Sequence, residues 1–303
     1  MDALVIALGG NALLQNGEKP SFPVQLKNAR RTAKSIARRL AKEKAFVITH
    51  GNGPQVGYEL LRNIYAGRKL PQMPLRIINA ETQAIIGSIL QSAIASELEK
   101  IGSKKRICTV LTHVVVDRKD KAFENPTKPI GPLYSKKELQ KQLKIEKFDY
   151  VMTGLLYRRV VASPRPLKII EIGQIKELVE DGFGVICCGG GGIPIFDDWN
   201  GANAVIDKDR TTQHLANSIK ASRMAILTNV DCVYKDYLGR RVPIKKIEAS
   251  SIGESLGDFD EGTMRPKLEA CTDFIMNGGK RAYIGSLFSL DSALAGTSGT
   301  LIM

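Results

Sequence analysis

ALVIALGGNALL, residues 3–14, begins with six apolar residues, continues into Gly9, Gly10 and Asn11, and then returns to apolar residues. An uninterrupted run of aliphatic residues predicts a strand that is buried on both faces, as in a parallel sheet. We expect a helix to follow the turn, because an amphipathic pattern comes next. The turn has three interpretations: a hairpin, a dinucleotide-binding loop, or a loop whose N–H groups hold a phosphoryl group.

Similar apolar runs recur along the chain, most of them followed by a turn and a helical pattern: AFVITH (45–50), RICTVLTHVVV (106–116), FGVICC (183–188) and MAILTNV (224–230). This alternation predicts an α/β fold, in which a mostly parallel sheet carries helices on both faces. Ligands of such sheets bind beyond the carboxyl ends of the strands. We therefore expect four turns to meet in one site, residues 9–11, 50–55, 189–192 and 228–231.

A segment rich in lysine and proline, about residues 117–166, interrupts the alternation. Its prolines exclude a regular helix or a central strand where they stand, at Pro126, Pro129, Pro132, Pro164 and Pro166. A solvated linker is one interpretation. The close spacing of proline, glycine and aromatic residues favours the other, an inserted lobe that projects from the sheet.

Composition limits the class of protein. A chain of 303 residues with 43% hydrophobic and 25% charged residues is typical of a soluble globular protein with one large domain or two. We expect a cytoplasmic protein that does not bind membranes, because no apolar stretch is long enough to cross one and the N-terminus lacks the features of a signal peptide. The five cysteines form no C-x-x-C pair, which argues against a disulfide framework and against a metal site in the protein.

The net charge of +13 raises the question of nucleic-acid binding. The densest basic stretch, residues 25–44, has apolar residues at helical spacing and therefore predicts an amphipathic helix with a solvated basic face. We favour this over a nucleic-acid contact and expect no nucleic-acid partner. An enzyme that acts on small polyanions would explain the charge equally well.

The absence of several known motifs excludes dinucleotide binding at the first turn, P-loop chemistry and the protein-kinase class. The first turn lacks the third glycine of a dinucleotide fingerprint, and neither a Walker A loop nor the protein-kinase motifs occur. Three lysines instead stand in constrained surroundings, Lys128 in NPTKPIG, Lys208 in AVIDKDR and Lys267 in TMRPKLEA. Lysines can stabilise the charge of a transferring phosphoryl group, and Asp209 could hold two of them in place.

The chain resembles the carbamate kinase branch of the amino acid kinase family. The resemblance rests on motifs that occur in order from residue 7 to 302: ALGGNALL, ITHGNGPQVG, ETQAIIG, NPTKPIGP, ASPRP, CCGGGGIPI, AVIDKD, LTNVDCVY, TMRPKLEA and GTLI. It implies an open αβα sandwich with about eight mainly parallel strands and a small protruding lobe. Residues 1–303 would form one domain, with an acceptor half (about 1–180), a nucleotide half (about 181–303) and a homodimeric assembly.

The resemblance also implies the reaction ATP + carbamate ⇌ ADP + carbamoyl phosphate, with Mg²⁺ as cofactor. The implied catalytic residues are Lys128, Lys208, Asp209 and Lys267. The implied substrate-binding residues are Gly9, Gly10, Asn11, Gly51, Asn52 and Gly53. The implied nucleotide-binding residues are Thr228, Val230, Tyr234, Gly262, Met264 and Pro266. No residue is expected to bind metal directly.

The residues themselves support an anionic acceptor, because carbamate is already an oxyanion and needs no general base. The chain departs from the family pattern at Asn203, Arg210, Asn229 and Arg265. These departures leave open a different small acid or phosphate as acceptor. A catalytically silent, ATP-binding regulator is a further alternative. Residues 79–102 carry an apolar stripe that fits either a dimer interface or a helix packed on the sheet.

Overall fold

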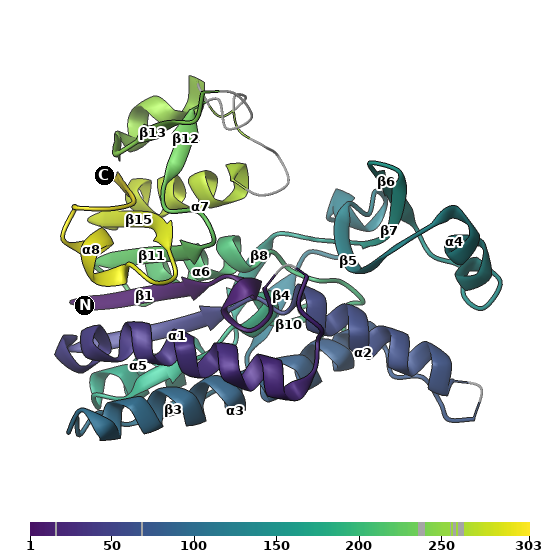
Figure 1. The fold of residues 1–303 in the computed structure, drawn as a ribbon, viewed down its shortest axis with the longest axis horizontal. Coiled ribbons are helices and arrows are strands. Elements are labelled where there is room, and N and C mark those ends of the chain that lie inside the picture. Colours follow the sequence, from purple (N-terminus) through teal and green to yellow (C-terminus); the bar gives the residue numbers. More distant parts are fainter. Residues whose placement is uncertain (16, 68, 236–239, 255, 257–258, 260–263) are drawn as a thin grey trace.

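The computed structural model describes residues 1–303 except 16, 68, 236–239, 255, 257–258 and 260–263. An eight-stranded sheet forms its centre, in the order β14-β16-β15-β11-β1-β2-β9-β3 (Figure 1). Neighbouring strands are parallel except β15 and β16. The strands are β1 Ala3–Leu8, β2 Ala45–His50, β3 Ile107–Thr109, β9 Gly184–Ile186, β11 Arg223–Thr228, β14 Lys246–Ile247, β15 Arg281–Ser286 and β16 Thr300–Ile302.

Strand β1 separates two hydrophobic cores. Its six residues are fully buried, and alternate side chains enter opposite cores because successive residues of a strand point to opposite faces. Helices α5 (Ile172–Glu180), α6 (Lys208–Ser218) and α7 (Arg265–Met276) pack in one core. Helices α1 (Phe22–Lys42), α3 (Leu75–Lys100) and α8 (Leu290–Leu294) pack in the other. The predicted αβα sandwich is therefore confirmed.

The helix predicted to follow the first glycine turn is present but does not begin at the turn. Residues Gly10–Ala12 form a single 3₁₀ turn, and α1 begins only at Phe22 with Pro23 in its first turn. Proline is accepted there because the N–H of that position has no partner within the helix. The second turn is different, since α2 (Gly53–Ala66) begins directly after Asn52.

Two helical predictions are confirmed. The basic stretch lies in α1, where the predicted apolar side chains from Ala29 to Leu40 are buried and Lys27, Arg30 and Lys34 are exposed. The apolar stripe of residues 79–102 lies in α3, and all of its predicted members except Ile85 are buried within this one chain. Packing against the sheet and α1 accounts for the stripe, so it is not evidence for a dimer.

The β-rich stretch 106–116 divides between two sheets. Strand β3 ends at Thr109, and β4 (His113–Val116) joins a separate sheet in the order β10-β4-β8. Strand β10 spans Ile193–Ile195 and β8 spans Pro166–Ile169. A short hairpin, β12 (Val233–Lys235) and β13 (Val242–Ile244), lies beyond β11.

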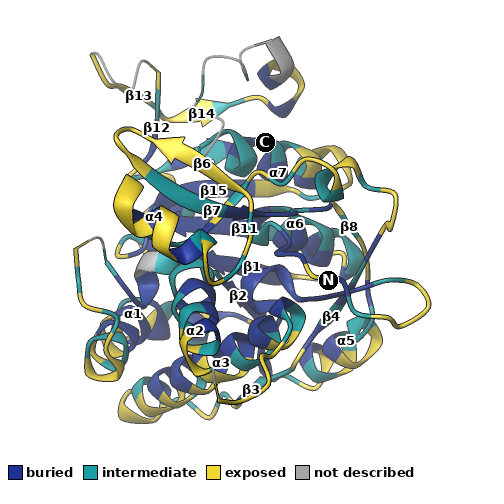
Figure 2. Cartoon of the chain, turned by 90° about the vertical axis from the view of Figure 1, so that its right-hand side faces the viewer, coloured by how far each residue is buried: buried dark blue, intermediate teal, exposed yellow. Residues whose placement is uncertain are grey.

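The segment predicted as a lobe contains its own antiparallel sheet, which projects to the right in Figure 1. Strand β5 (Lys128–Tyr134) and strand β6 (Tyr150–Thr153) flank β7 (Leu156–Val161), and α4 (Lys136–Leu143) starts with a capping box at Ser135. The prolines of β5 are accommodated because β5 is an edge strand. Figure 2 shows β6 as exposed, in contrast to the buried strands β1 and β2.

The lobe meets the body of the protein at a contact between two glycines. A Cβ added to Gly57 of α2 would lie 2.0 Å from the Cα of Gly131 in β5. No side chain fits at that distance, so glycine at position 57 lets the lobe approach α2. Within the lobe, Arg158 Nε of β7 donates a hydrogen bond to the Gly131 carbonyl at 3.0 Å, which fixes the backbone of β5 at this contact.

We expect Gly57→Ala to push the lobe away from α2 and to lower the free energy of unfolding by about 1–3 kcal/mol, the usual cost of overpacking. Urea unfolding measures the change. Gly173→Ala in α5 is the matched control, because a Cβ there meets nothing within 4 Å. It should leave stability unchanged or raise it by up to about 1 kcal/mol through helix propensity. Equal stability of the two variants would contradict the close contact.

Candidate active site

A buried aspartate holds two of the three predicted lysines. Asp209 lies in the first turn of α6, and its Oδ1 is 2.6 Å from Lys208 Nζ. Its Oδ2 accepts from Lys267 Nζ at 3.1 Å. Lys267 lies in the first turn of α7, so this carboxylate joins the ends of two helices and keeps two ammonium groups at one place.

Lys128, the third lysine, pairs with a different carboxylate. Its Nζ contacts Asp207 Oδ2, which links β5 of the lobe to the start of α6. The other oxygen of Asp207 caps α6 by accepting from the backbone N–H groups of Asp209 and Arg210 at 2.9 and 3.3 Å. The sequence analysis gave Asp207 no role. The signal was present, since aspartate directly before a helix is a preferred N-cap.

The electrostatics of this cluster keep Asp209 ionised. Burial alone would raise the pKa of its carboxyl group, but the Lys208 and Lys267 ammonium groups outweigh burial and lower the pKa. Burial lowers the pKa of Lys208, although Asp209 opposes the shift. For Lys267, Asp209 outweighs burial and raises the pKa. Asp209 therefore serves as a fixed counter-charge, not as a proton carrier.

The predicted glycine turns lie beside these lysines. A Cβ added to Gly51 would lie 3.3 Å from Gly10 N and 3.8 Å from Lys208 Cδ, so the first two turns and the lysine are in contact. Helix α2 begins at Gly53, and the side chain of its N-cap, Asn52, makes no capping bond. First-turn N–H groups without a helical partner favour an anion. The side chain of Asn11 is outside what the structure describes.

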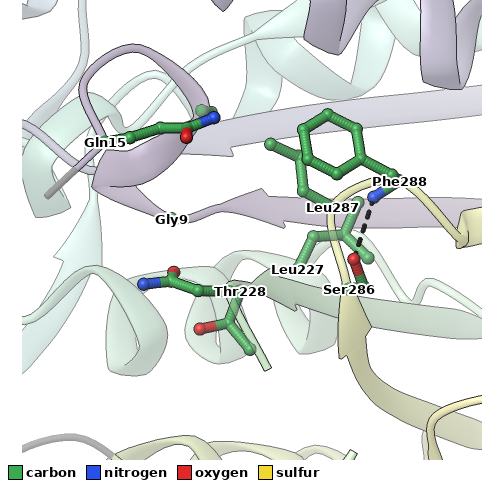
Figure 3. A pocket seen from close by; sticks show the side chains of 9 residues that line it. Gly9, Gln15, Leu227, Thr228, Ser286, Leu287 and Phe288 are labelled. Atoms are coloured by element: carbon green, nitrogen blue, oxygen red, sulfur yellow. Dashed lines mark hydrogen bonds between the residues drawn. The ribbon is translucent and has the colours of Figure 1, made fainter. Parts of the chain in front are cut away.

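An open pocket of about 320 Å³ adjoins the first turn. Figure 3 shows Gly9, Thr228 and Phe288 around it. It lies at the carboxyl ends of β1, β11 and β15, where ligands of parallel sheets bind. It brings together a residue predicted to bind the phosphoryl group, Gly9, and one predicted to bind nucleotide, Thr228.

The other residues predicted to bind nucleotide are spread over three places. Met264 and Pro266 stand at the start of α7 beside Lys267, and Val230 follows Asn229, which lines the pocket. Tyr234 lies in the β12–β13 hairpin, where its hydroxyl donates to Asp231 at 2.7 Å. Gly262 lies outside the described residues.

Two departures from the family pattern are linked in space. Arg210 Nη2 and Arg265 Nε donate to the two oxygens of Glu269, at 3.4 and 3.2 Å. This bridge joins the first turns of α6 and α7 next to the lysine cluster. Of the other two departures, Asn203 is exposed and Asn229 lines the pocket.

His50, at the end of β2, lies under the second turn. Its ring is buried, Nδ1 lies 3.2 Å from the Gly51 carbonyl, and Nε2 has no hydrogen-bond partner among the described residues. Burial lowers the pKa of His50 to about 4, so the ring is neutral near pH 7. Sequence reasoning placed His50 in a turn of the site, but the structure places its side chain in the interior.

This histidine predicts a loss of stability in acid. The pKa is about 6.5 in the unfolded chain and about 4 in the folded one, so between these values the unfolded state binds more protons. The free energy of unfolding should fall by about 3 kcal/mol as the pH drops from 7 to 4, because each pKa unit corresponds to about 1.4 kcal/mol. Urea unfolding of wild type and His50→Gln across this range measures it. A difference between the two proteins that does not change with pH would contradict the prediction.

The fold and the site define a class: α/β proteins with a mostly parallel central sheet whose glycine turns and buried lysines meet at the carboxyl ends of the strands. The chain belongs to the amino acid kinase family, whose model matches residues 2–286. It is 42% identical to carbamate kinases of Pyrococcus horikoshii and Clostridium perfringens, over 99% of this chain and 99% of each relative.

Solved structures agree with this assignment. The carbamate kinase from Giardia lamblia bound to AMP-PNP is 38% identical with a TM-score of 0.90, over 100% of this chain and 98% of that one. An N-acetylglutamate synthase from Neisseria gonorrhoeae, at 15% identity and a TM-score of 0.60, shares the fold alone. The predicted sheet of about eight strands is thus the architecture of the family. In the described part of the chain, no helix is long and apolar enough to cross a membrane.

Proposed function

We propose that the protein is a carbamate kinase, which transfers a phosphoryl group reversibly between ATP and carbamate. The observation that carries the proposal is the Lys208–Asp209–Lys267 cluster in contact with the glycine turns of β1 and β2. Relatives at 42% identity bear the name carbamate kinase, and one similar structure holds an ATP analogue. These names support the choice of substrates.

In the ATP-forming direction, a β-phosphate oxygen of ADP attacks the phosphorus of carbamoyl phosphate. The new P–O bond forms as the bond to the carbamate oxygen breaks, and carbamate leaves as an anion. No proton has to move, so no general base is needed. The chain's contribution is to align the reactants and to stabilise negative charge on the transferring group, through Lys208, Lys267 and the N–H groups of residues 9–11 and 51–53. Lys128 would add a third cation from the lobe.

Mg²⁺ would enter with the nucleotide and neutralise charge on its phosphates. Among the described residues, no group of three His, Cys, Asp or Glu side chains is placed to hold a metal ion. Asp207 and Asp209 are already paired with lysines. This donor set fits an ion held mainly by phosphate oxygens and water, with few protein ligands.

The same proposal assigns each substrate to one half of the chain. Carbamate would bind at the turns of residues 1–180, and ATP would bind over residues 181–303, with the lobe of residues 117–166 covering the acceptor. We place the enzyme in the cytoplasm as a homodimer.

A second candidate differs only in the acceptor. Arg210 and Arg265 bring two additional guanidinium groups to the helix ends that carry the lysines. A more highly charged acid or phosphate would gain from them. A panel of acceptors with ATP and Mg²⁺ decides, and a clear preference for another acid would replace carbamate in the proposal.

The direct test mixes the protein with ADP, Mg²⁺ and carbamoyl phosphate and follows ATP with a luciferase assay. We expect ATP formation well above the spontaneous breakdown of carbamoyl phosphate. Nucleotide binding in a calorimeter without turnover of any acceptor would indicate the alternative, a catalytically silent regulator.

Lys208→Met and Lys267→Met test the cluster. Each should lower kcat at least about tenfold, which corresponds to about 1.4 kcal/mol of lost transition-state stabilisation. Lys34→Met, on the exposed face of α1, is the control and should retain the wild-type rate. A wild-type kcat in either cluster variant would remove that lysine from the mechanism.

A further inference from the structure

Helix α3 buries two consecutive polar side chains at the sheet, Thr82 and Gln83, each 1% exposed. Burying a polar group is costly unless it is hydrogen-bonded. Neither residue belongs to the lysine cluster or to the glycine turns of β1 and β2. Their partners therefore show what the two side chains are for.

Gln83 holds the loop that follows β9. Its Oε1 accepts from Thr112 N at 2.6 Å, and its Nε2 donates to the Gly189 carbonyl at 3.1 Å. Thr112 in turn accepts at Oγ1 from Cys188 N, at 3.0 Å. The Gln83 amide thus binds two buried backbone groups. It holds Gly189 directly and Cys188 through Thr112.

This loop has a backbone that needs support from outside. Cys188, Gly190, Gly191 and Gly192 have φ values of 52°, 64°, 90° and 92°. For a cysteine, this left-handed conformation costs on the order of 1 kcal/mol or more. The loop also contacts helix α6, since the Gly191 carbonyl accepts from Thr211 Oγ1 at 3.0 Å.

Thr82 holds the neighbouring turn. Its Oγ1 accepts from Asn52 Nδ2 at 3.0 Å. The same Asn52 amide lies against Gly190, where an added Cβ would be 2.1 Å from Nδ2. His50 lies equally close to Gly189, since a Cβ there would be 2.3 Å from its ring. The loop of residues 188–192 therefore packs against the turn of residues 51–53. Gln83 of α3 holds the loop, and the adjacent Thr82 holds the turn.

We propose that Thr82 and Gln83 are positioning residues for the acceptor side of the site. They hold the loop of residues 188–192 under the turn of residues 51–53, so that the N–H groups of that turn face the acceptor at a fixed distance from Lys208. The kinetic part of this inference rests on the proposed function. Neither side chain contacts the lysines or the pocket at Thr228, so the effect is confined to the acceptor.

Gln83→Met tests the inference, because methionine keeps the length of the side chain and removes both hydrogen bonds. The KM for carbamoyl phosphate should rise by about 10-fold or more, because the misplaced turn no longer holds the acceptor at the geometry that the reaction needs. The KM for ADP should stay within about twofold. Equal changes in both KM values, or wild-type kinetics, would overturn the proposal.

Gln142→Met is the matched control. Gln142 is also buried, but it lies in α4 of the lobe and bonds the Tyr65 hydroxyl at 3.0 Å. Its loss should lower the melting temperature without separating the two KM values. If Gln83→Met does not fold, Thr82→Val and Thr82→Ser decide, since only serine keeps the hydroxyl that accepts from Asn52. We expect the kinetic loss in the valine variant alone, and equal kinetics of the two would overturn the proposal.

Hydrogen–deuterium exchange separates this inference from the proposed function. Peptides that cover residues 48–54 and 186–193 should exchange faster in Gln83→Met than in wild type or Gln142→Met, because the loop opens locally. If the wild-type protein makes no ATP from carbamoyl phosphate, the proposed function fails and exchange alone decides the positioning role. Unchanged exchange in both peptides would overturn it.

Discussion

The site depends on one interaction, in which the buried carboxylate of Asp209 lies between the ammonium groups of Lys208 and Lys267. An ionised Asp209 is tolerated in the interior only because Lys208 and Lys267 flank it, and the lysines are tolerated there for the same reason. Removing one member would leave a buried charge without a partner. The cluster therefore also constrains the fold, because it requires α6 and α7 to begin side by side at one edge of the sheet.

The rest of the architecture supplies that edge. Strand β1 is apolar on both faces, so it lies at the centre of the sheet with helices packed on each side. Parallel pairing of β1 with β2 and β11 brings their turns to the same end. The groups proposed to bind phosphate can then come from residues more than 200 positions apart.

The local sequence pattern was sufficient to predict the elements whose residues follow a regular spacing or a distinct composition. The buried strands, the basic helix and the inserted lobe follow from apolar spacing, amphipathicity and proline. The 3₁₀ turn at Gly10–Ala12 was not predicted, because its apolar residue Ala12 packs in the core, and the predicted helix α1 starts later, at Phe22. Periodicity cannot distinguish a short buried turn from the start of a helix.

Pairings across long sequence distances could not be predicted from pattern. The lysines stood out by their surroundings, and the structure brings Lys267 to Asp209, 58 residues away. Lys128 reaches Asp207 across 79 residues, because the lobe folds back over the start of α6. Gln83 was noticed only as part of the motif ETQAIIG, since a buried amide and an exposed one look alike in a sequence.

The two oxygens of Asp207 show how the lobe and the helix end can act separately. Oδ1 accepts the backbone N–H groups that cap α6, whereas Oδ2 takes the Lys128 ammonium group. In the proposed reaction, a phosphoryl group that drew Lys128 toward itself would leave the cap of α6 in place, and with it the position of Lys208 and Asp209. The contact of the lobe and the cap of α6 therefore meet at Asp207 on different oxygens. Such an arrangement suits a reaction that needs charge delivered to a substrate while the opposite wall of the site stays rigid.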